Sequence, residues 1–481
     1  MTCGRHAGPS LRSTRLPWTL VIAAALQLHA ARPAGQTTGW YSQGDFAPGA
    51  RFGFELINEL DVDRVNVPVV IRRNQVPLAD LHELAVTVVD PSLPAAPEPS
   101  AERLKVAGGH ERRQEANGHA ILHQLDDLDK DGVWDELFFV TDIPARATKT
   151  IHVYLGMNQR GWNPHETHAA IGSYCRHLVP FWESKHIGWK LWYPTSVDVY
   201  GKRSPMLVAH RLYMENLDGY GVTLIDSAMG SDIQSVESSF GAGGICLFEQ
   251  PATPDVVSVP RFTPARTAAG VTEGFNAGPI SDTRYAFDVV VNGPVRSMVR
   301  VKTMNWDTGR GSYEIEQLYT AYAHQSYSTC RVTFTRFLPK EHGVVPGAGI
   351  RKKPRENHFY QKGGIVITAG PEAIMDPDQG TISSDIDLIA SAMIVRDEYR
   401  PDYRFVPGFQ GNHAFRVVPG ADGSYEYLIA GAWSEGAVLN TYEAFEAYVI
   451  KTAREYASPL RVRGLPYERR PEDTRPARPP R

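Results

Sequence analysis

Three titratable side chains recur at every second position of one short segment, His358-Phe359-Tyr360-Gln361-Lys362. Alternate residues of a β-strand point to the same face of a sheet. If the segment is a strand, His358, Tyr360 and Lys362 therefore share one face. The pattern predicts a platform for acid/base chemistry. The alternative is structural, since a single histidine is usually a hydrogen-bonded structural residue and strand aromatics are usually core.

A second run, Asp198-Val199-Tyr200-Gly201-Lys202-Arg203, shows the same alternation. Tyr200 and Lys202 share one face of the expected strand, and Arg203 lies just beyond them. Cationic side chains that converge on a cleft suit an acidic sugar, because a guanidinium can bind a carboxylate through two hydrogen bonds. A solvated strand end explains the run equally well.

Other polar and aromatic residues at strand-like positions are of the kind that line sugar-binding clefts. Aromatic faces stack on the C–H faces of pyranose rings, and polar groups bind the hydroxyls. Two of these residues are carboxylates on one strand face, about 7 Å apart by strand geometry, a spacing compatible with glycoside hydrolysis. The residues expected to bind substrate are Trp192, Tyr200, Lys362, His413, Glu314 and Glu316.

An acidic segment, Asp127-Leu128-Asp129-Lys130-Asp131-Gly132-Val133-Trp134-Asp135-Glu136, has the outline of a calcium loop. Its alternate carboxylates can converge on one cation, and its glycine permits a tight turn. It is not an EF-hand, because Phe138 stands where a bidentate glutamate belongs and the flanks read as strands. We expect a structural Ca²⁺ held by Asp127, Asp129, Asp131 and Asp135. An acidic turn without metal is the alternative.

The elements that must position these residues are mostly strands. From about residue 45 to 160, short strand-like runs separated by turn residues predict a small β-sandwich unit that contains the acidic segment. From residue 161 to 458, longer strands alternate apolar with polar residues, which favours large antiparallel sheets stacked on one another. Helical spacing is clear only from Thr441 to Tyr456. The expected fold class is all-β.

Both ends of the chain differ from this pattern. At the N-terminus, arginines precede an apolar run from Leu16 to Leu28, which predicts a signal peptide over residues 1–35 and a secreted or periplasmic protein. No segment reaches the roughly 20 apolar residues of a membrane span. At the C-terminus, residues 459–481 are rich in Arg and Pro, which predicts a disordered tail.

Net charge limits the possible partners. The formal charge is −4 and the pI is near 6.5, and no basic stripe interleaved with aromatics crosses the body of the chain. We therefore expect no nucleic-acid partner. Three cysteines remain after the signal peptide, an odd and widely spaced set that implies no disulfide framework.

The chain resembles a bacterial family of unknown function found in exported proteins of polysaccharide-utilisation gene clusters. The resemblance rests on the acidic segment with its flanks, on Asp198-Val199-Tyr200-Gly201-Lys202, on Gly219-Tyr220-Gly221, and on Ser239-Phe240-Gly241-Ala242-Gly243-Gly244. Members look similar to the β-supersandwich of galactose mutarotases and polysaccharide lyases. The resemblance implies such a supersandwich behind the small β-sandwich unit, and a glycan as substrate.

Together, these features predict an exported carbohydrate-active protein, with a lyase of uronic-acid-containing glycans as the leading hypothesis. In β-elimination, His358 or Tyr360 would remove the proton next to the carboxylate. Lys202 or Arg203 would neutralise that carboxylate. A glycoside hydrolase with paired carboxylates and a non-catalytic glycan-binding module are the alternatives.

Overall fold

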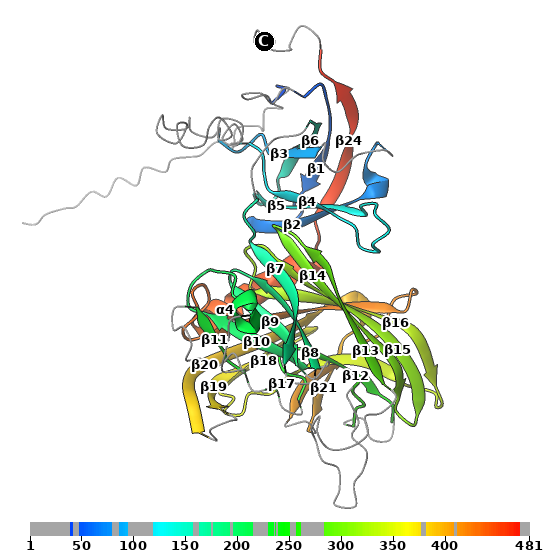
Figure 1. Cartoon of the computed structure of the whole chain (residues 1–481), viewed down its shortest axis with the longest axis vertical. Coiled ribbons are helices and arrows are strands. Elements are labelled where there is room, and N and C mark those ends of the chain that lie inside the picture. The colour runs from blue at the N-terminus through cyan, green and yellow to red at the C-terminus, as the bar shows by residue number, and fades with distance from the viewer. Residues whose placement is uncertain are drawn as a thin grey trace, which may run out of the picture. The chain divides into compact units, whose positions relative to one another are not determined.

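The computed structural model is built almost wholly from antiparallel β-strands (Figure 1). The predicted all-β sandwich class is confirmed. No helix among the described residues is long and apolar enough to cross a membrane. The predicted signal peptide lies outside the described residues. The structure describes residues 39–41, 48–78, 86–94, 119–156, 163–174, 177–192, 196–214, 229–234, 236, 239–250, 256–260, 283–376, 381–407 and 411–471.

The N-terminal β unit has two sheets around one apolar core. Alternation in β1 buries Phe52, Phe54 and Leu56 on a single face, where they meet core residues of the second sheet such as Val69 and Phe139. The first sheet has the order β24-β1-β6-β3 and the second β2-β5-β4. Their strands are β1 (Ala50–Ile57), β2 (Arg64–Arg72), β3 (Val86–Val89), β4 (His123–Asp126), β5 (Glu136–Ile143), β6 (Thr148–Leu155) and β24 (Arg461–Arg469).

Strand β24 corrects one prediction. The Arg and Pro content of segment 459–481 predicts disorder, yet Arg461–Arg469 pairs with β1 on both sides of a bulge between Arg51 and Gly53. Opposite charges face each other across this pair, with Arg463 bonded to Glu55 and Arg51 to Glu468, and such cross-strand pairs stabilise a sheet. β24 is an edge strand, where the proline at position 466 breaks no ladder on its open side.

Three further sheets belong with the N-terminal unit to one compact unit, Tyr41–Arg481. Their orders are β11-β10-β9-β8-β7, β12-β17-β22-β21 and β13-β14-β15-β16-β23-β20-β19-β18. The strands are β7 (Thr167–Tyr174), β8 (His177–Ser184), β9 (Ile187–Trp192), β10 (Ser196–Lys202), β11 (Gly230–Asp232), β12 (Gly244–Phe248), β13 (Arg284–Asn292), β14 (Arg296–Asp307), β15 (Gly311–Tyr322), β16 (Tyr327–Pro339), β17 (Val345–Arg351), β18 (His358–Lys362), β19 (Ile365–Asp376), β20 (Thr381–Val395), β21 (Asp402–Val406), β22 (Asn412–Arg416) and β23 (Ser424–Trp433).

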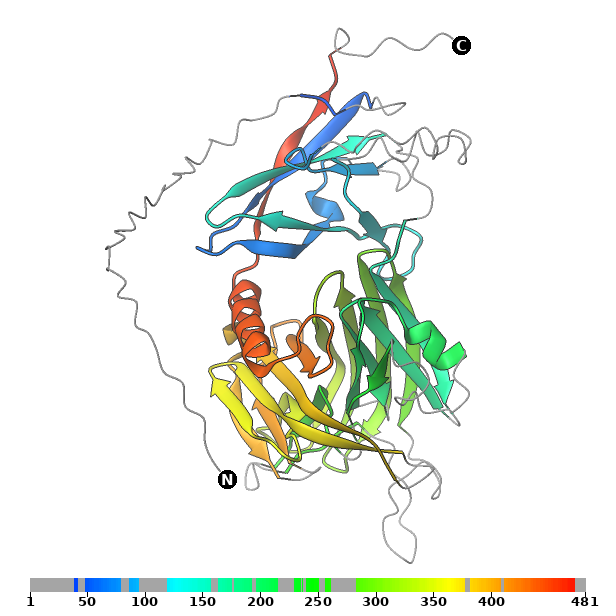
Figure 2. The ribbon, with the colours of Figure 1, turned by 90° about the vertical axis from the view of Figure 1, so that its left-hand side faces the viewer.

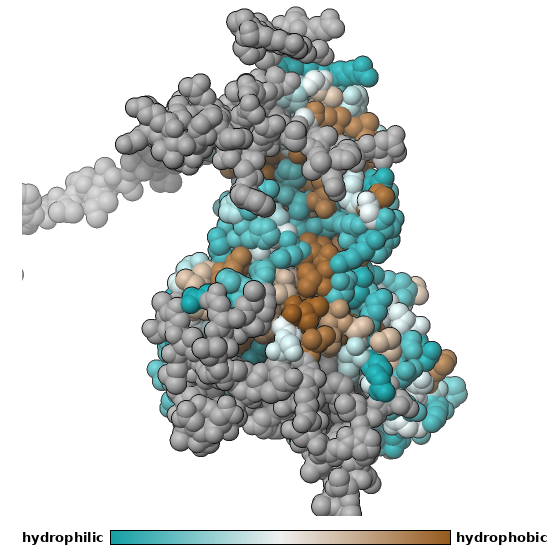
Figure 3. All heavy atoms as spheres, viewed as in Figure 1, coloured by the Kyte–Doolittle hydropathy of each residue, from teal (hydrophilic) through white to brown (hydrophobic). Residues whose placement is uncertain are grey.

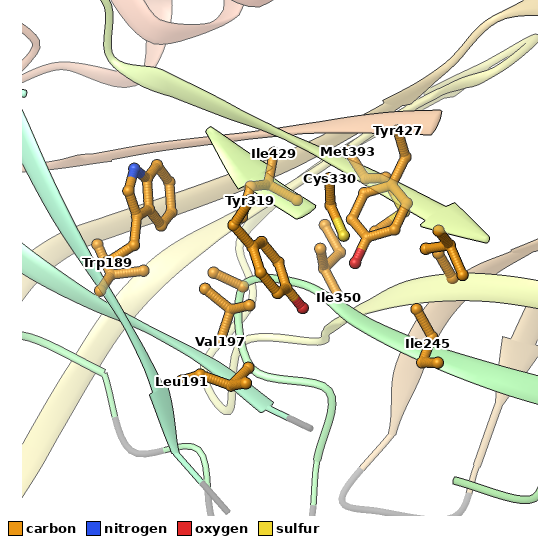
Figure 4. Close-up of a cluster of buried hydrophobic side chains, with 14 of the residues drawn as sticks. Trp189, Leu191, Val197, Ile245, Tyr319, Cys330, Ile350, Met393, Tyr427 and Ile429 are labelled. Atoms are coloured by element: carbon orange, nitrogen blue, oxygen red, sulfur yellow. The ribbon is translucent and has the colours of Figure 1, made fainter. Parts of the chain in front are cut away.

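The main core lies between these sheets. Side chains from several of their strands point toward one another in Figure 4, among them Trp189, Val197 and Tyr319. The rings of Tyr319 and Trp182 stack with centroids 4.5 Å apart. Burying a large apolar side chain contributes about 1.5–3 kcal/mol, so this cluster dominates the stability of the unit. On the face shown in Figure 3, hydrophilic side chains cover much of the described surface and apolar ones gather in smaller patches.

Helix α4 (Tyr442–Ala457) covers part of the largest sheet (Figure 2). Its N-terminus is capped by Thr441, whose hydroxyl accepts a hydrogen bond from the backbone of Ala444. Phe445, Val449 and Ala453 follow at four-residue spacing and pack against β19, β20 and β23. The helix predicted from this spacing is confirmed. The other α-helix among the described residues, α3 (Ala209–Met214), is short.

Candidate functional site

A group of buried charges gathers on strands β9, β10 and β11. Lys190 stands opposite Asp198 in the β9–β10 register, and its Nζ lies 3.3 Å from Asp198 Oδ2 and 2.5 Å from Asp232 Oδ2. The indole of Trp192 lies 5.2 Å from the same ammonium. Val199, the neighbour of Asp198, points to the opposite face and joins the main core. Because side chains alternate along β10, the carboxyl group of Asp198 points toward Lys190 and Asp232, away from the main core.

More polar side chains reach the same region from the other sheets. Lys353, which follows β17, donates from Nζ to Gln234 Oε1 over 2.5 Å, and Ser391 donates to the same oxygen over 3.3 Å. Arg351 binds Glu372 of β19 at 2.7 Å. We call Lys190, Asp198, Asp232, Gln234, Arg351, Lys353 and Glu372 the charge cluster.

Gln234 and Glu372 of the charge cluster each have a polar atom with unused hydrogen-bonding capacity. Gln234 Nε2 and Glu372 Oε2 are buried and have no hydrogen-bond partner among the described residues. A buried donor or acceptor without a partner costs about 1–3 kcal/mol. The first can donate to a ligand and the second can accept from one, so a polar ligand that satisfies both would recover that cost.

Burial sets the protonation of the charge cluster. It raises the pKa of Asp198 to about 8, with help from the negative charge of Asp232. It lowers the pKa of Lys353 to about 8. Burial opposes the charge of Lys190 too, but its two aspartate partners outweigh that effect and raise its pKa. Near neutral pH the cluster therefore holds a protonated carboxyl and an ammonium that releases its proton readily, as acid/base catalysis requires.

A hydrogen-bonded relay lies beside the charge cluster. His413 Nε2 is 2.9 Å from Glu356 Oε2, and His413 Nδ1 is 2.9 Å from the hydroxyl of Tyr403. Burial outweighs Glu356 and lowers the pKa of His413, so the ring is neutral at pH 7. Since a carboxylate only accepts, Nε2 carries the proton and Nδ1 accepts from Tyr403. Thr368 joins this relay to the cluster, because it donates to Glu356 and accepts from the backbone N–H of Lys353.

The predicted platform on β18 is a strand, as expected, but it faces helix α4. The ring of His358 stacks on Tyr442 at 4.1 Å, and Tyr360 packs against the cluster that α4 completes. Lys362 is exposed. Phe359, on the opposite face of β18, contacts His413 instead. The geometry therefore gives no support to a catalytic role for His358 and Tyr360, which stays a prediction.

The predicted cations of β10 have other partners. Lys202 is fully buried and donates to Glu183 and to the backbone oxygens of Ser184 and Met206. Arg203 donates to Glu435 and lies 4.9 Å from the ring of Trp433. In the described part of the chain, no hydrogen bond or ion pair connects either cation to β18. Their proposed role toward a substrate carboxylate is therefore not favoured by the geometry.

Apart from Lys362, which is exposed at the end of β18, the residues predicted to bind substrate divide into two groups. Trp192, Tyr200 and His413 lie in or beside the charge cluster and the relay; Tyr200 is opposite Asp232 in the β10–β11 register. Glu314 and Glu316 lie apart on β15, where they pair with Arg336 and with Arg300 and Lys302. Ion pairs on a half-exposed sheet face account for these two glutamates without a substrate.

Several residues of the site escaped sequence reasoning. Asp198 begins the run in which only Tyr200, Lys202 and Arg203 were singled out. Asp232, Gln234, Lys353, Glu356 and Tyr403 carried no spacing signal, because distant parts of the chain bring them together; Gln234 and Lys353 are 119 positions apart. A search for polar residues inside apolar strands would have found Asp198, between Val197 and Val199, and Lys190, between Trp189 and Leu191.

The acidic segment brings three of its four predicted ligands together. Oxygens of Asp127, Asp129 and Asp135 lie within 4.8 Å of one another, while Asp131 is outside this group. The turn relies on Gly132, whose φ of +88° favours glycine and whose N–H donates to Asp127. A set of hard carboxylate oxygens at this spacing fits Ca²⁺.

Comparison with known proteins identifies a family without an assigned activity. Residues 112–462 match the family described as "Domain of unknown function (DUF4861)". No curated protein matches the chain. Two similar solved structures are an alpha-mannosidase and a glycosyl hydrolase family 38 protein, both from Enterococcus faecalis. Each is 9% identical to this chain, and the TM-scores are 0.40 and 0.41. The matches cover 87% and 86% of this chain. They cover 46% and 47% of the two solved chains, so this chain spans about half of their length.

Proposed function

The chain belongs to the DUF4861 family, and we propose that it is a carbohydrate-active enzyme that cleaves a uronic-acid-containing glycan by β-elimination in the charge cluster. One feature carries the proposal: Asp198 and Lys353 lie buried in the same cluster, where burial raises the pKa of the carboxyl and lowers that of the ammonium, each to about 8. Pairs of groups shifted in this way are typical of acid/base sites. The sugar class rests on the sequence resemblance and on Trp192 at the edge of the cluster.

The reaction follows from these protonation states. Lys353, in its neutral form, removes the proton from the carbon next to the uronate carboxylate. The released electron pair forms a carbon–carbon double bond and expels the glycosidic oxygen, to which Asp198 transfers its proton. The products are an unsaturated uronate and a new reducing end. The cations Lys190 and Arg351 stabilise the negative charge that develops on the carboxylate.

Glycoside hydrolysis is the second candidate, favoured by a different observation. Asp198 and Asp232 bind the same ammonium, at 3.3 and 2.5 Å, so their Oδ2 atoms are at most 5.8 Å apart. Retaining glycosidases place their two carboxyl groups about 5–5.5 Å apart. In this reaction Asp198 would be the acid and Asp232 the nucleophile, and Lys353 would not take the proton from carbon.

The test is cleavage of a panel of uronate-containing and neutral polysaccharides by the purified protein. Ultraviolet absorbance reports the unsaturated product, and a reducing-end assay reports cleavage of either kind. β-Elimination requires both signals, and hydrolysis gives reducing ends alone. Absence of both signals from the wild-type protein contradicts an enzymatic function and leaves the non-catalytic glycan-binding module.

Substitutions then assign the catalytic roles. We expect Asp198→Asn to lower kcat by about 10²–10⁴-fold while folding normally, because an amide resembles the protonated carboxyl in size. Lys353→Met should abolish the ultraviolet signal. Asp387→Asn is the matched control, since Asp387 is exposed on β20. Full activity in both cluster variants would overturn the assignment.

Two further proposals concern location and metal. We propose that residues 1–35 direct export, which a reporter fused behind this segment would test by its arrival outside the cytoplasm.

We also propose that Ca²⁺ stabilises the acidic segment through Asp127, Asp129 and Asp135. Its role is structural, because no bond joins these three carboxylates to the charge cluster among the described residues.

A further inference from the structure

Three aromatic rings surround His413, the buried histidine of the relay. Phe359 of β18 stacks on its imidazole at 4.7 Å, and Phe405 and Tyr403 of β21 lie 5.7 and 6.1 Å from it. Phe405 and His413 are direct partners in the β21–β22 register. We call Phe359, Tyr403 and Phe405 the aromatic surface, since all three rings reach solvent in some degree.

The two phenylalanines of the aromatic surface are unusually exposed to solvent. Phe359 is 48% exposed and Phe405 is 42% exposed, although the main core of the unit is packed without them. A single exposed apolar residue needs no explanation, whereas neighbouring ones mark an interaction site. Both of these exposed residues contact the same histidine, so they are neighbours on the protein surface.

Polar groups border the same surface. The hydroxyl of Tyr403 donates to His413, which leaves its oxygen free to accept from a ligand. Lys352 is half-buried at the edge, close enough that its charge acts to lower the pKa of His413. An apolar face bordered by one acceptor and one cationic donor matches a pyranose ring, which has an apolar C–H face and a rim of hydroxyls.

The backbone holds this surface in place before any ligand binds. The two phenylalanines stand on strands rather than on loops. At Gly411 the φ is +85°, and a Cβ there would lie 3.3 Å from the ring of Phe405 and 3.9 Å from Lys352. The turn therefore passes closely beneath Phe405. A preformed surface loses little conformational entropy on binding.

We propose that the aromatic surface is a glycan-binding site, in which pyranose rings stack on Phe359 and Phe405 while Tyr403 and Lys352 bind their hydroxyls. The ligand class rests on the glycan substrate proposed above, but the binding does not depend on catalysis. The relay runs from Tyr403 through His413, Glu356 and Thr368 to Lys353. A glycan bound at the aromatic surface is thus held next to the charge cluster.

The experiment measures affinity of the full mature protein for the same polysaccharide panel, by gel retardation and titration calorimetry. Stacking on an aromatic ring contributes about 0.5–1.5 kcal/mol, so Phe359→Ala and Phe405→Ala should each weaken binding by roughly two- to thirteenfold, and the double variant more. Leu338→Ala and Val418→Ala are matched controls, because these side chains are exposed elsewhere, at 61% and 47%.

Phe359→Ala also uncovers His413, so Phe405→Ala carries the test if the first variant unfolds at lower temperature. Unchanged affinity in Phe405→Ala, or a wild-type protein that binds no member of the panel, overturns the proposal. A protein that binds through this surface but cleaves nothing supports it while contradicting the proposed enzyme. Cleavage lost in Asp198→Asn with binding retained supports both.

Discussion

Asp198 and Lys190 face each other across adjacent strands, and 3.3 Å separates the carboxylate oxygen from the ammonium. The ammonium is closer still to Asp232, at 2.5 Å. One cation therefore serves two buried carboxyls, and the pKa of Asp198 is raised by burial and by Asp232 despite this partner. Lys190 thus forms its closer ion pair with Asp232, whose pKa is also raised by burial, while a pKa of about 8 leaves Asp198 protonated near neutral pH.

The first prediction is a stability minimum near pH 8. Burial raises the pKa of Asp198 from 3.8 to about 8. The contribution of this carboxyl to the free energy of unfolding is therefore complete below pH 3.8 and is lost as the pH rises to about 8. The pKa of Lys353 is lowered from 10.5 to about 8, so its contribution to stability grows as the pH rises from 8 to 10.5. Urea unfolding at each pH should show both slopes.

Substitutions separate the two slopes. Asp198→Asn should flatten the fall in unfolding free energy on the acid side of pH 8, and Lys353→Met should flatten the rise on the alkaline side. Asp387→Asn should change neither. A curve of the same shape in Asp198→Asn and in the wild type would show that this carboxyl does not titrate near pH 8 in the folded protein.

The second prediction concerns Ca²⁺. Binding to the folded state alone stabilises a protein by about 2.7 kcal/mol at a hundredfold excess over Kd, so Ca²⁺ should raise Tm and a chelator should lower it. Asp129→Asn should remove most of this effect, whereas Asp131→Asn, outside the group of three oxygens, should retain it. Calorimetric scans with Ca²⁺, Mg²⁺ and chelator are the measurement. Equal Tm values in all three would contradict a calcium site.

Sequence patterns predicted local structure well and the meeting of distant residues poorly. The alternation of β10 and β18 follows from the period of a strand, and the convergence of Asp127 with Asp135 follows from their proximity in the chain. Which face of β18 meets a partner depends on α4, some 80 residues later, and no local pattern contains that information. The contact between Lys353 and Gln234 was not predicted for the same reason, because it forms only when distant parts of the chain pack together.

The third prediction follows from β24, whose composition resembled a disordered tail. A chain that ends after Leu460 lacks this strand and leaves β1 as an open edge, so its Tm should fall by more than about 5 °C and it should associate through the edge. A chain that ends after Pro471 keeps β24 and should match the full chain. Scanning calorimetry and gel filtration compare the two, and equal behaviour of both truncations would contradict a stabilising strand.

The last prediction concerns the buried pair Glu183 and Lys202. Burial disfavours the carboxylate, but Lys202, His168 and backbone N–H groups outweigh it and lower the pKa of Glu183 to about 2. Glu183→Gln leaves the ammonium buried without its counter-charge, which should cost roughly 3–5 kcal/mol of unfolding free energy. The double variant with Lys202→Met removes both charges and should lose less than the two single variants combined. Urea unfolding of the four proteins gives the coupling, and simple additivity would show that the two charges do not stabilise each other.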